Sequence, residues 1–375
     1  MAKPLRVLLV ISDLSGGGAE RQFSLLVQHL SPSKCELHLC VWRRKLTYRL
    51  PDGLPIHIVE KTRAWHAARA MRGLRRLIED LNPAVVFSTL HYVNMVTGSA
   101  LAGARCQPAW VCRQCSDPRR DMKGPFLLWA RRALRRANRV VGISHGVSRA
   151  VVDYLHVDRE RVHTIYNGVD VAQIDRLAGE PLPFRRDPRV FTVVHAGRLS
   201  REKNQSMLLD AFARFRGRRA ELWMLGQGRL GSRLRARARR LRISEQVKWI
   251  GFDRNPFRFF RQADCLALSS DWEGLSNVII EAMVCGTPVV STNCRYGPGE
   301  LIENGTTGWL TPVGDAGCFA DALEHLFDNR AAARRLGAAA RDRNVTRFGI
   351  MRACRDYETL FETVSNRQGS DGGID

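Results

Sequence analysis

The sequence predicts an α/β protein with two doubly wound, Rossmann-like domains. Strand-like apolar runs alternate with helix-like stretches in both halves of the chain, and a proline-rich segment without periodicity separates the halves at residues 179–188. The length of 375 residues also suits two domains. Strands that alternate with helices form a mainly parallel sheet covered on both faces, so we expect this architecture in each half.

The first half opens with a buried strand at residues 5–11, followed by a glycine-rich loop and an amphipathic helix at 20–30. A second helix is predicted at 63–81 because its apolar residues recur at helical spacing. The other strands are predicted at residues 36–41, 84–88, 110–112, 140–143 and 162–165. These elements define an N-terminal domain at residues 1–178.

The same pattern restarts after the linker and defines a second domain at residues 189–343. Its predicted strands are 191–195, 221–225, 247–250, 264–268 and 288–291, and its predicted helices are 205–215, 230–241 and 278–285. A C-terminal helix is expected at 344–366 and a disordered polar tail at 367–375. Doubly wound domains bind ligands at the carboxyl ends of their strands, so we expect the two domains to face each other across a ligand-binding cleft.

The charge balance is strongly positive, with 59 Lys and Arg against 37 Asp and Glu and a net charge of +22. Such a charge attracts phosphorylated substrates, anionic lipid and nucleic acid, and does not by itself choose among them. A nucleic-acid-binding protein is therefore an alternative, although none of the usual modules is visible. No apolar run approaches the roughly 20 residues of a membrane-spanning helix. Since the N-terminus also lacks the apolar core of a signal peptide, we expect a cytoplasmic protein.

The ten cysteines are scattered, mostly through apolar runs, where cysteine behaves as a small hydrophobic residue. Without a secretory signal, reduced thiols are expected. Cys112 and Cys115 form a C-x-x-C motif, but no second pair lies at the spacing of a zinc site. No metal site is predicted.

The glycine-rich loop after the first strand reads Ser15-Gly16-Gly17-Gly18. Glycines let the backbone approach a ligand closely, and the helix that follows presents free amides to an anion. The loop lacks the G-x-G-x-x-G pattern, which disfavours a dinucleotide ligand. A plain tight turn is the alternative interpretation.

Two cations follow the first strand of the second domain. Arg198 and Lys203 lie in the loop that begins at Gly197, at the carboxyl end of the strand. A fixed guanidinium and an ammonium in this position could neutralise a departing diphosphate. Solvated surface charge is the alternative for this segment taken alone.

Two glutamates, Glu273 and Glu281, follow the strand at 264–268. Ser276 or Asn277 would cap the helix that follows, and Glu281 would lie inside that otherwise apolar helix. Eight residues of helix rise about 12 Å, which exceeds the roughly 5–9.5 Å between glycosidase carboxylates. We therefore expect the two carboxylates to contact different parts of one long ligand.

The segment from Glu273 to Val290, E-G-L-S-N-V-I-I-E-A-M-V-C-G-T-P-V-V, resembles the E-x7-E signature of family 4 retaining glycosyltransferases. The resemblance extends to other motifs in the same order along the chain. They are Gly18-Ala19-Glu20-Arg21, Tyr166-Asn167-Gly168-Val169-Asp170, Gly197-Arg198 with Lys203-Asn204, Gly226-x-Gly228, and Trp249-Ile250-Gly251-Phe252. It implies the GT-B fold, in which the C-terminal helix crosses back onto the first domain.

The resemblance also implies roles for individual residues. Arg198 and Lys203 would bind the donor diphosphate, Glu273 the hydroxyls of the transferred sugar, and Glu281 the ribose. Glu273, Arg198 and Lys203 are the candidate catalytic residues. The other candidate donor-binding residues are Gly17, Gly18, Gly251, Phe252, Gly274, Leu275, Ser276 and Asn277.

The resemblance implies transfer of a hexose or N-acetylhexosamine from a nucleotide-diphosphate sugar, with UDP as the favoured nucleotide. The acceptor would be a glycan or a polyprenyl-linked sugar in polysaccharide or glycolipid synthesis. Leaving-group charge would be stabilised by the two cations and a helix dipole, so no metal or other cofactor is expected. A nucleotide-sugar epimerase of the same fold is a further alternative.

The sequence of the predicted acceptor side differs from that of many relatives, which carry a histidine just after the strand at 110–112. This sequence has Arg113 and Asp117 there, in an arrangement found in a subset of the family, and both are acceptor-side candidates. His91 and His145 follow two other predicted strands and are also candidates, each against the alternative of a structural histidine.

Arginines at 131, 132, 135, 136 and 139 are interleaved with apolar residues at 126–129 and 134. A basic amphipathic surface of this kind could rest on anionic lipid at the cytoplasmic face of the inner membrane. A solvated arginine-rich helix is the alternative.

Overall fold

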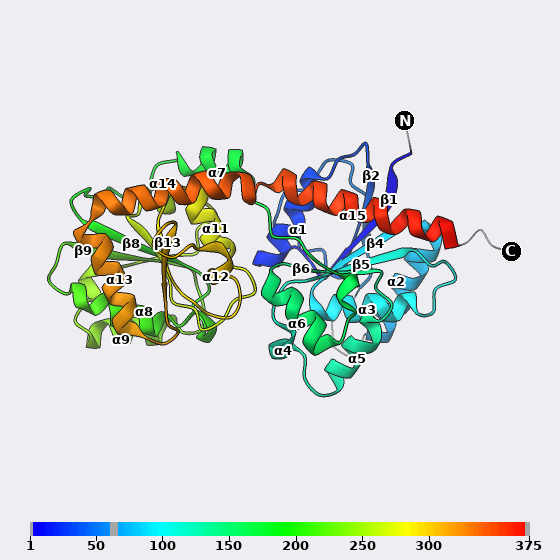
Figure 1. Ribbon diagram of the computed structural model, residues 1–375, viewed down its shortest axis with the longest axis horizontal. Helices are drawn as coiled ribbons and strands as arrows, with labels where there is room; N and C mark the ends of the chain where they lie inside the picture. The colour runs from blue at the N-terminus through cyan, green and yellow to red at the C-terminus, as the bar shows by residue number, and fades with distance from the viewer. Residues whose placement is uncertain (1–2, 61–66, 372–375) are drawn as a thin grey trace. The chain divides into compact units, whose positions relative to one another are not determined.

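The computed structural model describes residues 3–60 and 67–371 and divides the chain into two compact units (Figure 1). Unit 1 comprises Met1–Gly168 and Ile350–Asp375, and unit 2 comprises Val169–Gly349. The boundary therefore falls before helix α7 (Val171–Ala178), not after it as predicted. The reason is that α7 packs on α10 (Phe257–Gln262) and that Asp175 forms 2.7 Å ion pairs with Arg261 and Arg341.

Unit 1 contains a seven-stranded parallel sheet in the order β3-β2-β1-β4-β5-β6-β7. The strands are β1 (Leu5–Ile11), β2 (Cys35–Val41), β3 (Ile56–Ile58), β4 (Val85–Thr89), β5 (Ala109–Gln114), β6 (Arg139–Gly142) and β7 (Val162–Thr164). The helices are α1 (Gly18–His29), α2 (Ala67–Leu81), α3 (His91–Leu101), α4 (Pro118–Asp121), α5 (Pro125–Leu134), α6 (His145–Leu155) and α15 (Ile350–Asp371). The strand order reverses between β1 and β4, as in a doubly wound fold.

The core of unit 1 lies on both faces of this sheet because successive residues of a strand point to opposite sides. Val7, Leu9 and Ile11 of β1 belong to a buried cluster with α1 and α15. Leu8 and Val10 belong to a second cluster with α2, α3 and α5. The apolar run of β1 is thus buried on both faces, as its sequence predicted.

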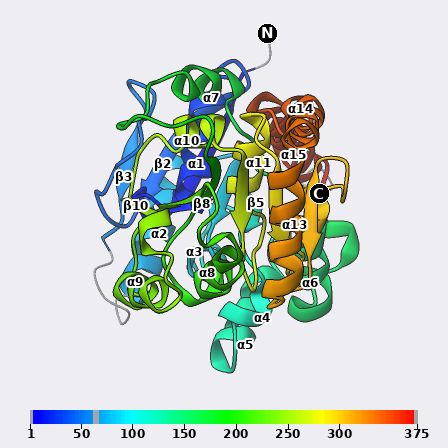
Figure 2. The ribbon, with the colours of Figure 1, turned by 90° about the vertical axis from the view of Figure 1, so that its left-hand side faces the viewer.

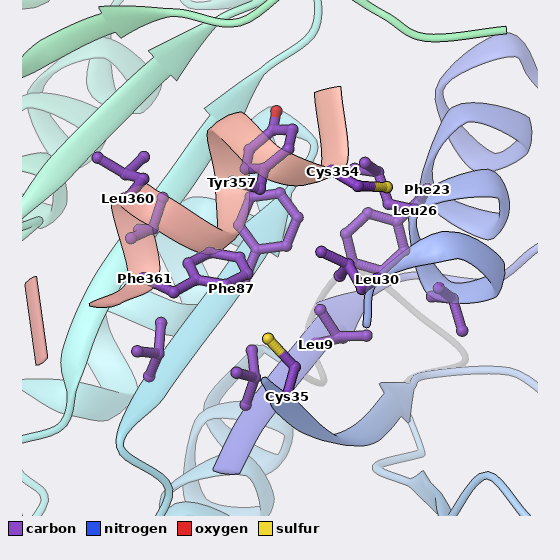
Figure 3. Packing of buried hydrophobic residues seen from close by; sticks show 14 of the residues in the cluster. Leu9, Phe23, Leu26, Leu30, Cys35, Phe87, Cys354, Tyr357, Leu360 and Phe361 are labelled. Atoms are coloured by element: carbon purple, nitrogen blue, oxygen red, sulfur yellow. The ribbon is translucent and has the colours of Figure 1, made fainter. Parts of the chain in front are cut away.

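The C-terminal helix α15 supplies part of the first cluster (Figure 3). The ring centroids of Tyr357 and Phe361 lie 5.0 and 5.4 Å from that of Phe87 in β4, and Phe87 stacks on Phe23 of α1 at 5.5 Å. The predicted return of this helix to the first domain is confirmed.

The bounds of α15 differ from the prediction. Residues 344–347 belong to α14 (Arg330–Arg347) of unit 2. The helical conformation is interrupted at Phe348-Gly349, and α15 begins at Ile350. A 2.8 Å hydrogen bond from the Val169 amide to the Phe348 carbonyl stabilises this interruption of the helix. The helix continues to Asp371, so the first part of the predicted disordered tail is helical, and residues 372–375 lie outside the described residues.

Unit 2 contains a six-stranded parallel sheet in the order β10-β9-β8-β11-β12-β13. Figure 2 shows this unit with two of its strands, β8 and β10, labelled. The strands are β8 (Phe191–Ala196), β9 (Ala220–Leu225), β10 (Val247–Gly251), β11 (Cys265–Leu268), β12 (Val289–Thr292) and β13 (Gly308–Thr311). The remaining helices are α8 (Gln205–Phe212), α9 (Gly231–Arg240), α11 (Asn277–Val284), α12 (Pro298–Leu301) and α13 (Ala316–Asp328). The strand order reverses between β8 and β11.

Several elements were not predicted, among them β3, β13 and α3. Strands β3 and β13 are only three and four residues long, too short to show a period. Helix α3 buries eight of its eleven residues, so it lacks the polar face by which an amphipathic helix is recognised. The predicted helix at 63–81 begins among residues that the structure does not describe and is observed from Ala67. No helix in the described part of the chain is long and apolar enough to cross a membrane.

Candidate active site

The candidate donor site lies at the point where the strand order of unit 2 reverses. Strands β8 and β11 are neighbours there, with Cys265 paired to Val193 and Leu266 to Val194. The loops that leave their carboxyl ends, residues 197–204 and 269–276, carry the three candidate catalytic residues, Arg198, Lys203 and Glu273. A reversal of strand order opens a crevice between such loops, which is where α/β sheets bind ligands.

Lys203 and Glu273 meet between these two loops. The lysine Nζ lies 2.5 Å from Oε1 of the glutamate, and the side chains are only 18% and 11% exposed. The Ser270 hydroxyl donates a 2.8 Å hydrogen bond to the same Oε1. The acidic and basic residues that the sequence placed in separate motifs therefore form one polar cluster.

Further hydrogen bonds join the same two loops. Asn204 Nδ2 donates to Asp271 Oδ1 at 2.7 Å, and the Asp271 amide donates to the Glu202 carbonyl at 2.9 Å. Asn204, with a φ of 42°, also accepts a hydrogen bond from the Met207 amide and so caps α8. This network fixes the backbone on both sides of Lys203.

His195 lies beneath the loops, fully buried at the end of β8. Its Nδ1 donates to the Ala267 carbonyl of β11 at 2.9 Å, and its Nε2 accepts from Gln205 Nε2 at 3.2 Å. Burial lowers the pKa of His195 to about 4. The imidazole is therefore neutral at neutral pH and ties β8, β11 and α8 together.

Arg198 differs from Lys203 in its exposure. Its carbonyl is held by Gln205 Nε2 at 2.8 Å, whereas its side chain is exposed to solvent. Among the residues that the structure describes, its guanidinium forms no ion pair with an acidic side chain. The loop thus presents an exposed cation next to a half-buried one.

Residues 272–276 form a loop, and helix α11 begins only at Asn277. The estimate that eight residues of helical rise separate Glu273 from Glu281 is therefore wrong, because Glu273 precedes the helix. Residues 295–297 support the loop: the Glu273 amide donates to the Arg295 carbonyl at 3.2 Å, and the Tyr296 amide donates to the Glu273 carbonyl at 2.9 Å.

Helix α11 carries the other donor-site candidates. Glu281 is buried within it, with 3% exposure, and Leu275 and Ser276 are buried just before it. Ser276 occupies the cap position, but its hydroxyl has no hydrogen-bond partner within the described structure. The amides of the first turn are therefore not capped by this side chain, and the Ile279 amide donates instead to the Ser276 carbonyl at 3.1 Å.

Glycines bring the loops after β8 and β9 into contact. A Cβ on Gly226 would lie 2.0 Å from the Gly197 carbonyl oxygen, and one on Gly228 would lie 2.2 Å from that of Leu199. The Gly226 amide also donates a 2.6 Å hydrogen bond to the Gly251 carbonyl at the end of β10. Phe252, the next residue, is 65% exposed.

The glycine-rich loop of unit 1 joins β1 to α1. Gly17 caps α1 with an extended backbone, and Gly18 is the first helical residue. The Glu20 carboxylate lies against Gly17, because a Cβ there would be 2.0 Å from Glu20 Oε2. The N-terminal end of this helix therefore has an acidic side chain, that of Glu20, as its neighbour.

His91 follows β4, at the point where the strand order of unit 1 reverses. Its Nε2 lies 2.7 Å from Ser116 Oγ and 3.0 Å from Asp121 Oδ2, and the Ser116 hydroxyl donates to the same Oδ2 at 2.6 Å. The hydrogen bond with His91 lowers the pKa of Asp121. Leu90, just before it, has a φ of 79°, a strained value for a leucine.

The other acceptor-side candidates have different surroundings. Arg113 is buried, with 2% exposure, and donates to Thr89 Oγ1 at 3.3 Å and Asn167 Oδ1 at 2.5 Å. Asp117 caps the short helix α4 by accepting from the Arg119 amide at 3.1 Å. These contacts give both residues a structural role. His145 is exposed at the start of α6, with its ring edge-on to Tyr166.

Two family models match the chain in succession. The model described as Glycosyltransferase Family 4 matches residues 16–173, and the model described as Glycosyl transferases group 1 matches residues 180–343. Together they account for most of the chain. The chain belongs to the family 4 glycosyltransferases.

Similar proteins agree with this assignment. An N-acetylgalactosaminyltransferase of Campylobacter jejuni that acts on a diphospho-undecaprenol-linked sugar is 27% identical over 337 residues, which cover 86% of this chain and 90% of the relative. The lipopolysaccharide core biosynthesis glycosyltransferase LpsE of Rhizobium meliloti is 32% identical over 180 residues, 48% of this chain and 49% of the relative.

Solved structures share the fold of this glycosyltransferase. Anabaena HepE in complex with UDP has a TM-score of 0.79 at 20% identity, covering 96% of this chain and all of the other. Sucrose-phosphate synthase from Thermosynechococcus elongatus has a TM-score of 0.81 at 16% identity, covering 96% of this chain and 99% of the other. The predicted α/β fold, GT-B, is confirmed.

The candidate residues of the glycosyltransferase thus fall into two groups. Lys203 and Glu273 are in contact in unit 2, and Arg198 lies on the loop of Lys203. Unit 1 carries Gly17, Gly18 and the acceptor-side candidates. The sequence interpretation missed Ser270, Asn204, Asp271, Ser116 and Asp121. Ser270 and Asp271 could have been found, since polar residues directly after a parallel strand belong to the ligand-binding edge of the sheet.

Proposed function

We propose that this glycosyltransferase transfers a hexose or N-acetylhexosamine from a UDP-sugar to a glycan or polyprenyl-linked acceptor, with retention of anomeric configuration and without a metal ion. The observation that carries the proposal is the contact between Lys203 and Glu273 at the strand-order reversal of unit 2. It puts a group that binds phosphate next to a group that binds sugar hydroxyls.

The cations would act on the leaving group. When the bond between the anomeric carbon and the diphosphate breaks, negative charge develops on the diphosphate oxygens. Fixed donors aimed at developing charge lower the barrier because they need no reorganisation during the reaction. Arg198 and Lys203 supply such donors from this chain's own residues, and the dipole of α11 adds positive potential at its N-terminus, so the proposal needs no metal ion.

The carboxylates would hold the two ends of the donor. Lys203 and Ser270 both contact Oε1 of Glu273, and the other carboxylate oxygen, Oε2, can accept a hydrogen bond from a sugar hydroxyl. Glu281, buried in α11, is assigned to the ribose, and the backbone near Gly251 and Phe252 to the base. A buried carboxylate that receives hydroxyl donors recovers the cost of its desolvation.

Similar proteins support the choice of donor and acceptor. HepE was solved with UDP and with UDP-glucose, and its fold covers nearly all of this chain. The Campylobacter relative is named for a lipid-linked diphosphate acceptor. We therefore propose that the donor is a UDP-sugar and that the acceptor is an intermediate of polysaccharide or glycolipid synthesis.

The acceptor side is assigned to the cluster of His91, Ser116 and Asp121. An aspartate that accepts from the imidazole holds the ring in place, and the serine hydroxyl adds a second polar group beside it. Such a cluster can bind an acceptor hydroxyl and receive its proton.

The test is a thermal-shift panel of UDP-, GDP- and ADP-sugars. A ligand that binds the folded state raises the melting temperature, and we expect UDP-sugars to do so. Lys203→Ala should abolish this shift. Lys248→Ala is the matched control, because Lys248 also pairs with a glutamate, Glu221 at 2.8 Å, but on strands β10 and β9. A panel in which no nucleotide sugar stabilises the protein contradicts the proposal.

Product analysis tests the rest of the proposal. Proton NMR of the product formed in EDTA should show the anomeric configuration of the donor retained. An inverted product contradicts the proposed retention of configuration. Activity that is lost in EDTA and restored by a divalent cation contradicts the proposed independence of metal. A changed sugar released without any acceptor would instead indicate an epimerase.

A further inference from the structure

Gln205, the first residue of α8, contacts the loop that carries Arg198. Its side chain is buried, with 1% exposure. The side-chain Nε2 donates two hydrogen bonds, one to the Arg198 carbonyl at 2.8 Å and one to His195 Nε2 at 3.2 Å. Gln205 therefore joins the buried end of β8 to the loop of the exposed cation that is assigned to the donor diphosphate.

The tautomer of His195 fixes the orientation of the Gln205 amide. A carbonyl oxygen only accepts, so the His195 Nδ1 that contacts the Ala267 carbonyl at 2.9 Å carries the proton. Because burial keeps the imidazole neutral at neutral pH, its Nε2 is then an acceptor. This nitrogen and the Arg198 carbonyl are both acceptors, and only the NH2 end of the amide can satisfy them.

The opposite end of the same amide has no partner. The Oε1 atom of Gln205 is buried and accepts no hydrogen bond from the residues that the structure describes. An unpaired buried polar atom costs free energy, so stability alone does not favour this arrangement. The orientation that leaves Oε1 unpaired is the one that holds the Arg198 carbonyl, which indicates that the position of this loop matters for binding.

The peptide group between Arg198 and Leu199 is held on both sides. Its carbonyl accepts from Gln205, and its amide donates to the Gln227 carbonyl at 3.0 Å. The amide of the residue before Arg198 donates to the last carbonyl of β9, also at 3.0 Å. The backbone is thus fixed on both sides of the Arg198 Cα, although the guanidinium itself is exposed.

A second donor near the same carbonyl does not replace Gln205. The Ser200 hydroxyl oxygen lies 3.2 Å from the Arg198 carbonyl oxygen and 2.5 Å from Glu202 Oε1. A hydroxyl carries one proton, and its shorter contact with a carboxylate is the stronger hydrogen bond. The Gln205 amide is therefore the principal donor to this carbonyl.

A fixed loop matters because Arg198 is exposed. A loop that becomes ordered only on binding costs affinity, whereas a loop fixed beforehand avoids this cost. We propose that Gln205, oriented by His195, is a positioning residue that holds the Arg198 loop where the guanidinium meets the donor diphosphate. The inference rests on the proposed function and extends it to two buried residues below the exposed loop.

Hydrogen exchange of the Leu199 amide, measured without ligand, tests whether Gln205 holds the loop. Gln205→Met keeps the side chain's length but removes both hydrogen bonds, and we expect this amide to exchange at least about ten-fold faster than in wild type. Gln246→Met is the matched control. The Gln246 Nε2 also contacts backbone carbonyls, three of them at 2.9, 3.0 and 3.0 Å, but it lies before β10, at the other end of the sheet. In this control the Leu199 amide should exchange as in wild type.

Calorimetry with UDP and an NMR titration with uridine test the consequence for the donor. Gln205→Met should bind UDP about ten-fold more weakly, because Arg198 is no longer directed at the diphosphate. Uridine has no phosphate, so its affinity should stay within about two-fold of wild type. Gln246→Met should bind both ligands as wild type does.

His195→Phe tests whether the imidazole orients the amide. It removes the acceptor that faces Gln205, so UDP should bind up to about ten-fold more weakly than to wild type. The double variant with Gln205→Met should bind UDP about as weakly as Gln205→Met alone, since both substitutions act on one contact. Circular dichroism and urea unfolding show whether each variant is folded.

Three results would overturn the inference. The first is unchanged exchange of the Leu199 amide in Gln205→Met. The second is an equal loss of affinity for UDP and uridine, or an equal loss in Gln246→Met, which would indicate general destabilisation. The third is additive losses in the double variant. Wild type that binds no UDP would contradict the proposed function and the role at the diphosphate, whereas the exchange data would still show whether Gln205 holds the loop.

Discussion

Lys203 and Glu273 are 70 residues apart in the sequence, yet Nζ of the lysine lies 2.5 Å from Oε1 of the glutamate. The contact exists because β8 and β11 are neighbours in the sheet, so that the loops following them leave from the same edge. Since both side chains are largely buried, each determines the charge that the other presents to a ligand.

The first prediction concerns the negative charge of this pair. Glu273→Gln keeps an acceptor for Ser270 but leaves the Lys203 ammonium without its counter-ion. We expect UDP to bind as tightly as to wild type or up to about ten-fold more tightly, because repulsion of the diphosphate is removed. Transfer should fall at least about 100-fold, because the contact with the transferred sugar is lost.

Calorimetric titration with UDP and initial-rate measurements separate these two effects. Weaker UDP binding by Glu273→Gln than by wild type would show that the Glu273 carboxylate does not repel the diphosphate. Unfolding by urea should accompany both measurements, because an unpaired Lys203 also reduces stability.

The second prediction concerns His195. Burial lowers its pKa to about 4 from 6.5, so between these pH values the unfolded chain binds a proton that the folded protein does not. The contribution of this group to stability is therefore present above about pH 6.5 and is lost as the pH falls towards 4, by up to about 3 kcal/mol.

The measurement is the free energy of unfolding across that pH range for wild type and His195→Gln. The variant should be less stable than wild type at neutral pH, and the difference should shrink as the pH falls. A difference that is constant with pH would show that His195 titrates normally in the folded state.

The third prediction concerns the contact between the loops after β8 and β9. Gly228→Ala would put a Cβ 2.2 Å from the Leu199 carbonyl oxygen, so the loop of Arg198 must move. We expect a loss of about 1–3 kcal/mol in stability and weaker binding of the donor.

Gly231→Ala is the matched control for this substitution. It lies three residues further on, and its Cβ would meet only a Leu199 methyl at 3.6 Å. As the first residue of α9, it should tolerate alanine with no loss of stability. Equal melting temperatures for the two variants would contradict the proposed close approach.

The fourth prediction concerns α15. Phe361 is fully buried against Phe87, so Phe361→Ala should cost about 3–5 kcal/mol of the free energy of unfolding. Met351 on the same helix is 52% exposed, and Met351→Ala should change stability by less than about 0.5 kcal/mol. Hydrogen exchange of Phe361→Ala should show faster exchange in unit 1 than in unit 2, and uniform destabilisation would be the contrary result.

The fifth prediction concerns the acceptor side. Asp121→Asn removes the negative charge that holds the His91 imidazole, and we expect turnover to fall about 10- to 100-fold while UDP affinity is unchanged. Asp153→Asn is the control, because Asp153 also carries a partly exposed carboxylate in unit 1 but pairs with Arg119. Unchanged turnover in Asp121→Asn would contradict the assignment of His91 to the acceptor site.

Much of the fold could be read from local patterns. The apolar run at residues 5–11 is buried on both faces of its sheet, and helices with one apolar stripe appear where their period predicted them. Local pattern failed for α3, which is buried all round, and for the border between α14 and α15, which depends on a hydrogen bond from Val169 to Phe348.

Local patterns along the chain predict the kind of chemistry: two α/β domains, cations at the end of one strand and carboxylates after another. Which of these groups meet depends on how each domain folds. Strand order placed Lys203 against Glu273, buried Arg113 among internal partners, and gave His91 the unforeseen partner Asp121. The physical reason is that strand neighbours in a parallel sheet are chosen by packing across the whole domain, and no short stretch of sequence contains that information.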